Sequence, residues 1–139
     1  MATSNVPIFP QAITNAGKQF NNATSTTITT LFTAGTNGSC IEFLNCATTD
    51  TAANNVTFYL NDGTTSYTLG VVQVPATSGT LYNIPAVSIF ASANISSLTY
   101  DANGNKVLML ASGWSLQASV LAAVTSGKTL NFTMQIANW

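Results

Sequence analysis

The chain has 139 residues, which suits a single domain with one hydrophobic core. Only 5% of its residues are charged, against about 25% in an average soluble domain, and the formal net charge is −1. Three lysines without any arginine cannot neutralise a nucleic-acid backbone or an anionic membrane surface, so we expect no nucleic-acid and no membrane partner. The apolar fraction of 46% predicts a folded chain with a packed interior.

Reactive side chains are scarce. Because histidine is absent, Ser-His-Asp and Cys-His arrangements for nucleophilic catalysis are impossible. Cys40 and Cys46 stand six residues apart in one expected strand, which would separate them by roughly 20 Å, whereas a disulfide needs Cα atoms within about 7 Å. Two cysteines are also too few for a zinc site. We therefore expect two free, buried thiols, no enzyme, no catalytic residues, no cofactor and no metal.

The first 25 residues are interpreted as an extended arm. Pro7 and Pro10 favour an extended course, and the spacing of the apolar residues fits neither a helix face nor a strand. The hypothesis is that the arm docks four apolar side chains on a neighbouring subunit. They are Ile8, Phe9, Ile13 and Phe20. The alternative is a loosely draped terminus. The start of the chain lacks the features of a secretory signal, so we expect synthesis in a cytoplasm.

Strand patterns begin at Thr26. Residues 26–35 are rich in β-branched side chains, and residues 40–47 form an apolar run typical of a strand buried on both faces. Apolar and polar residues alternate over 56–61, and Asn61-Asp62-Gly63 predicts a turn before a returning strand over 66–74. Gly70 is predicted to mark a bulge, because the apolar residues on its two sides lie on opposite phases.

The second half of the chain continues in short strands. We expect strands over 80–84 and 106–110, while residues 85–98 are ambiguous and could open with a helical turn at Pro85. Residues 113–139 predict a β-hairpin, because two runs with apolar residues at alternate positions flank a turn at 125–128. Its inner face should carry Trp114, Leu116, Ala118, Val120, Leu130, Phe132, Met134 and Ile136.

Together these patterns predict an all-β protein, an antiparallel β-sandwich of jelly-roll type with eight to nine short strands. The expected division is an arm over 1–25 and a sandwich domain over 26–139. Apolar residues occupy both phases in 41–46, 71–74 and 107–110. Because each sheet of a sandwich has only one inner face, some of these residues should contact another subunit. We therefore expect a symmetric homo-oligomer, with a trimer favoured.

Two weaker patterns leave alternatives open. The run from Asp101 to Asn105 resembles the start of a calcium loop, but Lys106 and Ser112 replace the required Gly and Glu, so a turn is favoured. Tyr59 lies on the opposite phase from the apolar residues of its strand. It is the best candidate for a sugar-stacking platform, and the alternative is packing against a neighbour or beneath a loop.

Three segments share a distinctive set of turns. They are VTFYLNDGTTSYTLGVVQVPATSGT (56–80), YDANGNKVLMLASGWSLQA (100–118) and AAVTSGKTLNFTMQIANW (122–139). They contain an LNDG turn after a strand, a D-x-x-G-N turn before a strand ending in L-x-x-G, and a V-T-x-G-K-T hairpin. Over most of residues 30–139, the chain resembles small virion proteins encoded among the head and structural genes of tailed bacteriophages. The resemblance implies a β-sandwich on the capsid surface, often trimeric, and no catalytic residues.

We therefore expect a structural virion protein of a tailed bacteriophage. The leading hypothesis is a capsid decoration or cement protein that is made in the host cytoplasm, binds the major capsid protein and stabilises the outer head surface. The first alternative is a receptor- or glycan-binding β-sandwich module of a phage tail or fibre. The second is a subunit of a cellular filament or surface layer.

Overall fold

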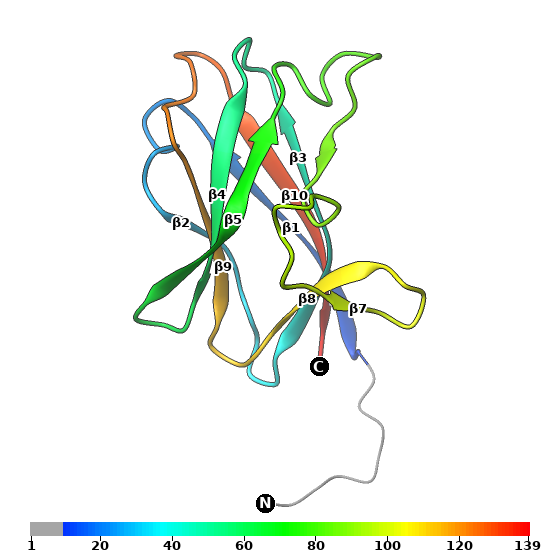
Figure 1. Ribbon diagram of the computed structural model, residues 1–139. Helices are drawn as coiled ribbons and strands as arrows, with labels where there is room; N and C mark the ends of the chain where they lie inside the picture. Colours follow the sequence, from blue (N-terminus) through cyan, green and yellow to red (C-terminus); the bar gives the residue numbers. More distant parts are fainter. Residues whose placement is uncertain (1–9) are drawn as a thin grey trace, which may run out of the picture.

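The computed structural model describes residues 10–139 and contains two β-sheets that face each other (Figure 1). The ten strands are β1 (Ala12–Phe20), β2 (Thr29–Thr33), β3 (Ser39–Thr48), β4 (Asn54–Asn61), β5 (Ser66–Val74), β6 (Val87–Ser88), β7 (Thr99–Tyr100), β8 (Lys106–Leu110), β9 (Ser115–Val120) and β10 (Leu130–Asn138). No helix occurs in this range, so it holds no helical segment that could cross a membrane.

The strand order is that of a jelly roll. The larger sheet has the order β1-β10-β3-β8-β7, with β6 beside β3, and the smaller sheet has the order β2-β9-β4-β5. If the two-residue strands β6 and β7 are set aside, the first strand pairs with the last, the second with the second last, and so on inward to β4 and β5. All pairs are antiparallel. The predicted all-β sandwich of jelly-roll type is confirmed, with ten strands instead of the expected eight to nine.

The hydrophobic core lies between the two sheets. Phe132 stands at its centre, with its ring edge-on to Phe20 at 5.2 Å and to Phe58 at 5.9 Å between centroids. The expected inner face is confirmed for seven side chains that are at most 2% exposed. They are Leu116, Ala118, Val120, Leu130, Phe132, Met134 and Ile136. Trp114 is only partly buried and packs at the margin of the core.

The predicted hairpin over 113–139 is wrong. β9 lies between β2 and β4 in the smaller sheet, whereas β10 lies between β1 and β3 in the larger sheet. The expected turn does form, with the Lys128 N–H donating to the Thr125 carbonyl at 2.9 Å. However, the connection from β9 to β10 passes from one sheet to the other. Apolar and polar residues alternate along two strands that face each other across a sandwich just as they do along the two strands of a hairpin, because in both cases each strand buries one face.

The predicted arm over 1–25 is also wrong where the structure describes it. β1 pairs with β10 along its full length, from Ala12 opposite Asn138 to Phe20 opposite Leu130. The sandwich therefore includes β1, and its boundary does not lie at residue 25. The spacing of the apolar residues did not reveal this strand, because it is an edge strand in which only Phe20 is fully buried in the core. Residues 1–9 lie outside the described residues.

Residues 75–98 consist mainly of turns. The strand expected over 80–84 is reduced to a single bridge between Leu81 and Ile84. The helical turn considered at Pro85 is absent from this segment, which instead forms the short strand β6 beside β3.

The bulge predicted at Gly70 is confirmed. Phe58 lies opposite Gly70, but the next residue, Tyr59, lies opposite Thr68, so Leu69 is the extra residue in β5. A Cβ atom on Gly70 would overlap the carbonyl oxygen of Asn94. Glycine is therefore needed here because the loop before β7 packs directly on the backbone of β5.

Candidate functional site

A row of apolar residues crosses the outer face of the larger sheet. The register places Ile13 opposite Ala137, Ala137 opposite Cys40, and Cys40 opposite Met109. Side chains directly opposite in antiparallel strands lie on the same face, so these four residues, named here the outer row, run across β1, β10, β3 and β8. The two ends are open to solvent, with Ile13 66% and Met109 55% exposed.

Trp139 covers the middle of the outer row. Cys40, Val107 and Ala137 form a small buried cluster, separate from the main core, and the partly buried Trp139 packs against it. This contact explains how Cys40 and Ala137 can be buried although they face away from the sandwich interior. The larger sheet therefore carries a second apolar surface on the side opposite the core.

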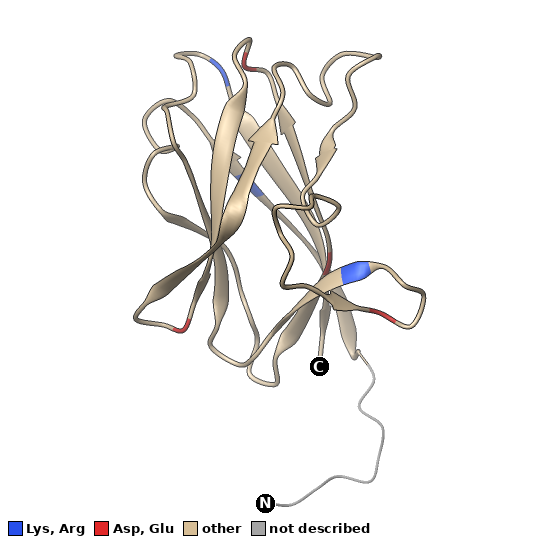
Figure 2. Cartoon of the chain, in the orientation of Figure 1, with Lys and Arg blue, Asp and Glu red and all other residues tan. Residues whose placement is uncertain are grey.

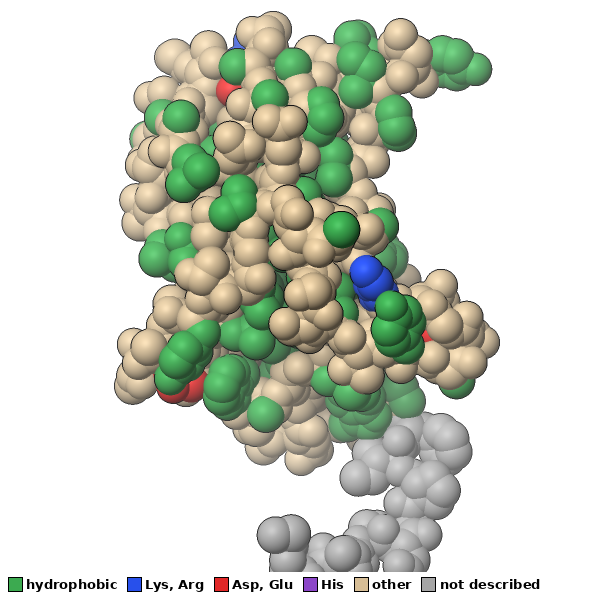
Figure 3. Space-filling model, in the orientation of Figure 1, with side chains coloured by type: hydrophobic (Ala, Val, Ile, Leu, Met, Phe, Trp, Pro, Cys, Tyr) green, Lys and Arg blue, Asp and Glu red, His purple; other side chains and the backbone are tan. Residues whose placement is uncertain are grey.

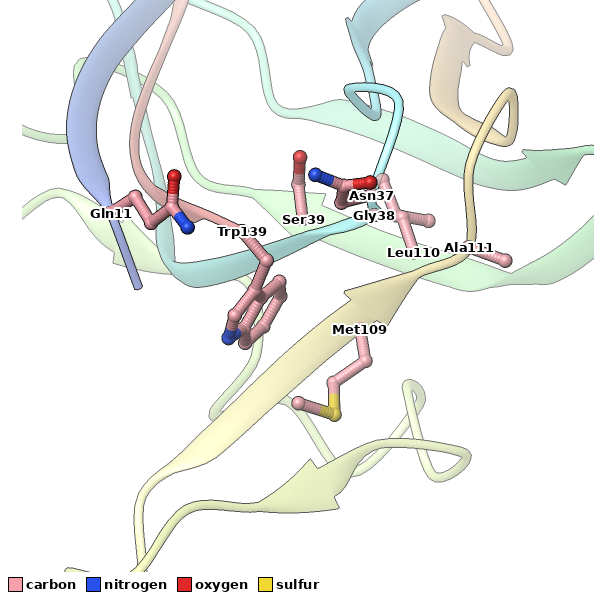
Figure 4. A pocket seen from close by; sticks show the side chains of 8 residues that line it. All are labelled: Gln11, Asn37, Gly38, Ser39, Met109, Leu110, Ala111 and Trp139. Carbon is pink, nitrogen blue, oxygen red and sulfur yellow. The ribbon is translucent and has the colours of Figure 1, made fainter. Parts of the chain in front are cut away.

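An open groove of about 680 Å³ lies beside Trp139. The indole of Trp139, which follows β10, and the thioether of Met109 in β8 extend to the same side of the backbone (Figure 4). The lining residues are Gln11, Asn37, Gly38, Ser39, Met109, Leu110, Ala111 and Trp139. None of the lining side chains is charged, so the groove combines apolar side chains with a few neutral hydrogen-bonding groups. This chemistry suits a protein surface more than an ionic ligand.

Charged side chains are scattered over the molecule rather than gathered at a site (Figure 2). Apolar side chains are far more numerous on the face shown in Figure 3. Asp62 and Asp101 stabilise turns through backbone hydrogen bonds, from Thr65 in the first case and Asn105 in the second, at 2.8 Å each. These bonds hold the pKa of both carboxyl groups below the usual range. The turn interpretation of residues 101–105 is confirmed.

Asp50 is the one buried carboxylate among the four in the chain. One oxygen accepts from the Thr125 hydroxyl at 2.7 Å and the Ala52 N–H at 3.0 Å, and the other accepts from the Thr125 N–H at 3.0 Å. Burial by itself raises the pKa of Asp50, but the hydrogen bonds from Thr125, Ala52 and Asn54 outweigh it and hold the pKa below its ordinary value. Asp50 therefore fastens the loop after β3 to the loop after β9.

The two cysteines are free and buried, as the sequence predicts. Burial raises the pKa of the Cys40 thiol to about 11, with further contributions from the charges of Glu42 and Asp101. Burial raises the pKa of the Cys46 thiol to about 12. Both thiols are therefore protonated and weakly nucleophilic near neutral pH. Within residues 10–139, no group of three or more potential metal-binding side chains is found.

The exposed aromatic residues give a second, smaller candidate. Tyr59 points outward from the smaller sheet, and its hydroxyl lies 3.1 Å from that of Ser119. Sequence reasoning missed a pair formed by Tyr67 and Trp114, whose rings stack at 6.4 Å and 20°. Tyr67 is half-exposed, and its hydroxyl donates to the Asp62 carboxylate at 3.1 Å. This pair offers a ring face beside a carboxylate.

The four residues proposed for docking have different outcomes. Ile8 and Phe9 lie outside the described residues. Ile13 forms one exposed end of the outer row, whereas Phe20 is fully buried in the core of its own chain and cannot dock on a neighbour. Met109 lies in 107–110, one of the segments in which apolar residues on both phases predicted contact with another subunit. The sequence did not predict that Trp139 packs over the outer row.

No protein-family model matches the chain, and no curated protein sequence matches it. The resemblance to phage virion proteins therefore rests on the turn motifs of the sequence.

Proposed function

We propose that this protein is a structural subunit of a tailed-bacteriophage particle, a capsid decoration or cement protein that binds the major capsid protein and stabilises the outer head surface. Its place is the virion, after synthesis in the host cytoplasm. The observation that carries the proposal is the apolar surface on the outer face of the larger sheet, formed by the uncharged side chains of the outer row, Trp139 and the adjoining groove. The turn motifs favour a virion setting for this surface.

The chemistry of the surface supports a binding role rather than catalysis. Each of the three aspartates is engaged by hydrogen bonds in a turn or a loop, and the two thiols are buried. Ile13 and Met109, in contrast, leave large apolar side chains in water at the two ends of the outer row. Covering them with a partner removes apolar area from water, at about 25 cal/mol per Å².

The proposed interface makes a specific prediction about salt. Because no side chain lining the groove is charged, attachment should depend on apolar contacts and neutral hydrogen bonds. Such binding changes little with ionic strength, whereas a charge-steered interface weakens as salt screens it.

The test uses purified particles of the phage whose genome encodes the chain. The protein should be found on heads by mass spectrometry, and recombinant protein should rebind to stripped heads with similar occupancy at low and high salt. Met109→Glu should abolish rebinding because it places a charge in the groove. Ile28→Glu, which changes an exposed apolar residue outside the groove, should bind like the wild type. Absence of the chain from heads, or full occupancy by Met109→Glu, would overturn the proposal.

A glycan-binding role on a tail or fibre is the second candidate, and the Tyr67–Trp114 pair favours it. A half-exposed tyrosine ring can stack on a sugar face, with the Asp62 carboxylate available beside it as a hydrogen-bond acceptor. A glycan array probed with wild-type protein and Tyr67→Ala tests this role. Specific binding that Tyr67→Ala removes, together with location on tails, would replace the capsid proposal.

A further inference from the structure

The edges of the two sheets differ in how well they are protected. An edge strand presents unpaired N–H and C=O groups that can accept another strand, and natural proteins shorten, distort or cover such edges. Within residues 10–139, β7 has only two residues, and β2 has five with an irregular register. The edge of β5 is covered, because the Asn94 side-chain amide donates to the Val71 carbonyl at 2.9 Å and Asn94 packs over Gly70.

Among the described residues, β1 is not shortened, distorted or covered in these ways. It is nine residues long and forms the outermost strand of the larger sheet. Its pairing with β10 continues without a register shift, and it contains no proline. All of its residues before Phe20 are at least partly exposed. Lys18 is its only charged residue; it lies opposite Phe132, on the core-facing side, and a lysine there disfavours any pairing that places another positive charge opposite it. Apart from this one lysine, the edge of β1 is open to another strand.

We propose that β1 pairs antiparallel with β1 of a second copy of the chain, about a two-fold axis at Ala16, so that the two larger sheets join into one continuous sheet. Ala16 is the midpoint of Ala12–Phe20, so this register pairs all nine residues of each strand. Ala12 then lies opposite Phe20 of the partner subunit. The arrangement is self-complementary, as a two-fold interface requires.

Two features of the strand favour this register. In this register, the residue numbers of two opposite residues differ by an even number. Side chains at even spacing in a strand point to the same face, so the core-facing side of one sheet continues as the core-facing side of the other. Lys18 lies opposite Thr14 of the partner subunit, so the two lysines do not face each other. A register centred on Lys18 would oppose like charges, which destabilises strand pairs.

The proposed dimer differs from the trimer that the sequence favours. A two-fold interface occupies the β1 edge of both copies, so no such edge remains for a third copy and the assembly stops at a dimer. The outer faces of the two larger sheets become one surface in this dimer, which brings the two outer rows onto the same side. The pairing itself does not depend on the capsid role.

The first test is the mass of the full chain in solution. Sedimentation equilibrium over a concentration series should show a species of twice the 14.5 kDa chain mass. A protein that remains monomeric at high concentration, or that forms a trimer, would overturn the proposal.

The second test traps the axis with a disulfide. Ala16 faces Ala16 of the partner subunit, and directly opposite Cα atoms lie about 4.5–5.5 Å apart, within disulfide range. Ala16→Cys should therefore form a covalent dimer under mild oxidation. Thr14→Cys is the control, because Thr14 and its equivalent would be about 13 Å apart along the strands. Equal cross-linking of the two variants, or none of the folded Ala16→Cys protein, would refute this register.

A charge pair provides a test that introduces no cysteine. Thr14→Asp and Thr14→Lys both remove the hydroxyl that accepts from the Asn138 side chain at 3.0 Å, so they differ in the charge placed opposite Lys18 of the partner subunit. The Asp variant should dimerise more tightly than the Lys variant, by roughly two- to thirtyfold in Kd, with a smaller difference at high salt. Equal dissociation constants at low salt would contradict the pairing.

Discussion

Replacing Phe20 with alanine separates the two interpretations of the N-terminal region. In a docking arm, Phe20 would contribute to contacts with a neighbour and hardly affect the stability of its own chain. In the structure it is fully buried, and its ring packs edge-on to Phe132 at 5.2 Å and 70°. Removing a buried phenylalanine side chain costs about 3–5 kcal/mol through lost transfer free energy and the cavity that remains. The edge-to-face contact favours the upper part of this range.

Ile13→Ala is the matched control. It truncates a large apolar residue in the same strand, but Ile13 is 66% exposed. Full burial of such a side chain contributes about 1.5–3 kcal/mol, and only about a third of it is covered here, so the expected loss is below about 1 kcal/mol. The difference between the two variants should therefore be at least about 2 kcal/mol.

The assay is urea unfolding followed by tryptophan fluorescence, at one protein concentration for all variants. The free energy of unfolding is obtained by linear extrapolation, and similar slopes would show that the variants unfold between comparable states. A free energy of unfolding for Phe20→Ala within about 1 kcal/mol of wild type would refute the assignment of β1 to the sandwich.

Three further predictions concern Asp50, the thiols and Gly70. Asp50→Asn should lower the free energy of unfolding by about 1–3 kcal/mol at pH 7, because both carboxylate oxygens of Asp50 accept hydrogen bonds, whereas the amide nitrogen of asparagine cannot accept one. Since the folded pKa of Asp50 lies below its unfolded value of about 3.9, its stabilisation is present above that value and lost as pH falls through the folded pKa. The free energy of unfolding should therefore fall more steeply with decreasing pH for the wild type than for the variant. Equal slopes in acid would contradict this. With thiol pKa values of about 11 and 12, Cys40 and Cys46 should react with a thiol reagent at pH 8 only after unfolding, and rapid native labelling would show that they are accessible. Gly70→Ala should destabilise the fold by about 1–3 kcal/mol, because the added Cβ meets the backbone of Asn94. Gly17→Ala should cost less, because its Cβ has more room. Calorimetry that ranks the two variants in the opposite order would disprove the argument.

Local patterns in the sequence correctly predicted much of the fold. Alternation along β10 identified its buried residues, including Phe132, because successive strand side chains point to opposite faces whatever the partner strand is. Turn chemistry identified the tight turns at Asp62 and Asp101, because an aspartate there accepts hydrogen bonds from backbone groups within the same few residues. The extended geometry between Cys40 and Cys46 likewise sufficed to predict free thiols.

Apart from the β4–β5 hairpin, which the Asn61-Asp62-Gly63 turn predicted, only the tertiary structure decided which strands pair. Alternation shows that β9 and β10 each bury one face, but it does not say whether they lie in one sheet or face each other across a core. β1 escaped notice because its burial in the core depends on Phe20 and its hydrogen bonds on β10, more than 100 residues away along the chain. The outer row likewise forms only when the register aligns one residue from each of four strands. Periodicity is a property of single segments. Where no tight turn joins two strands, their pairing and register depend on contacts between segments far apart in the chain.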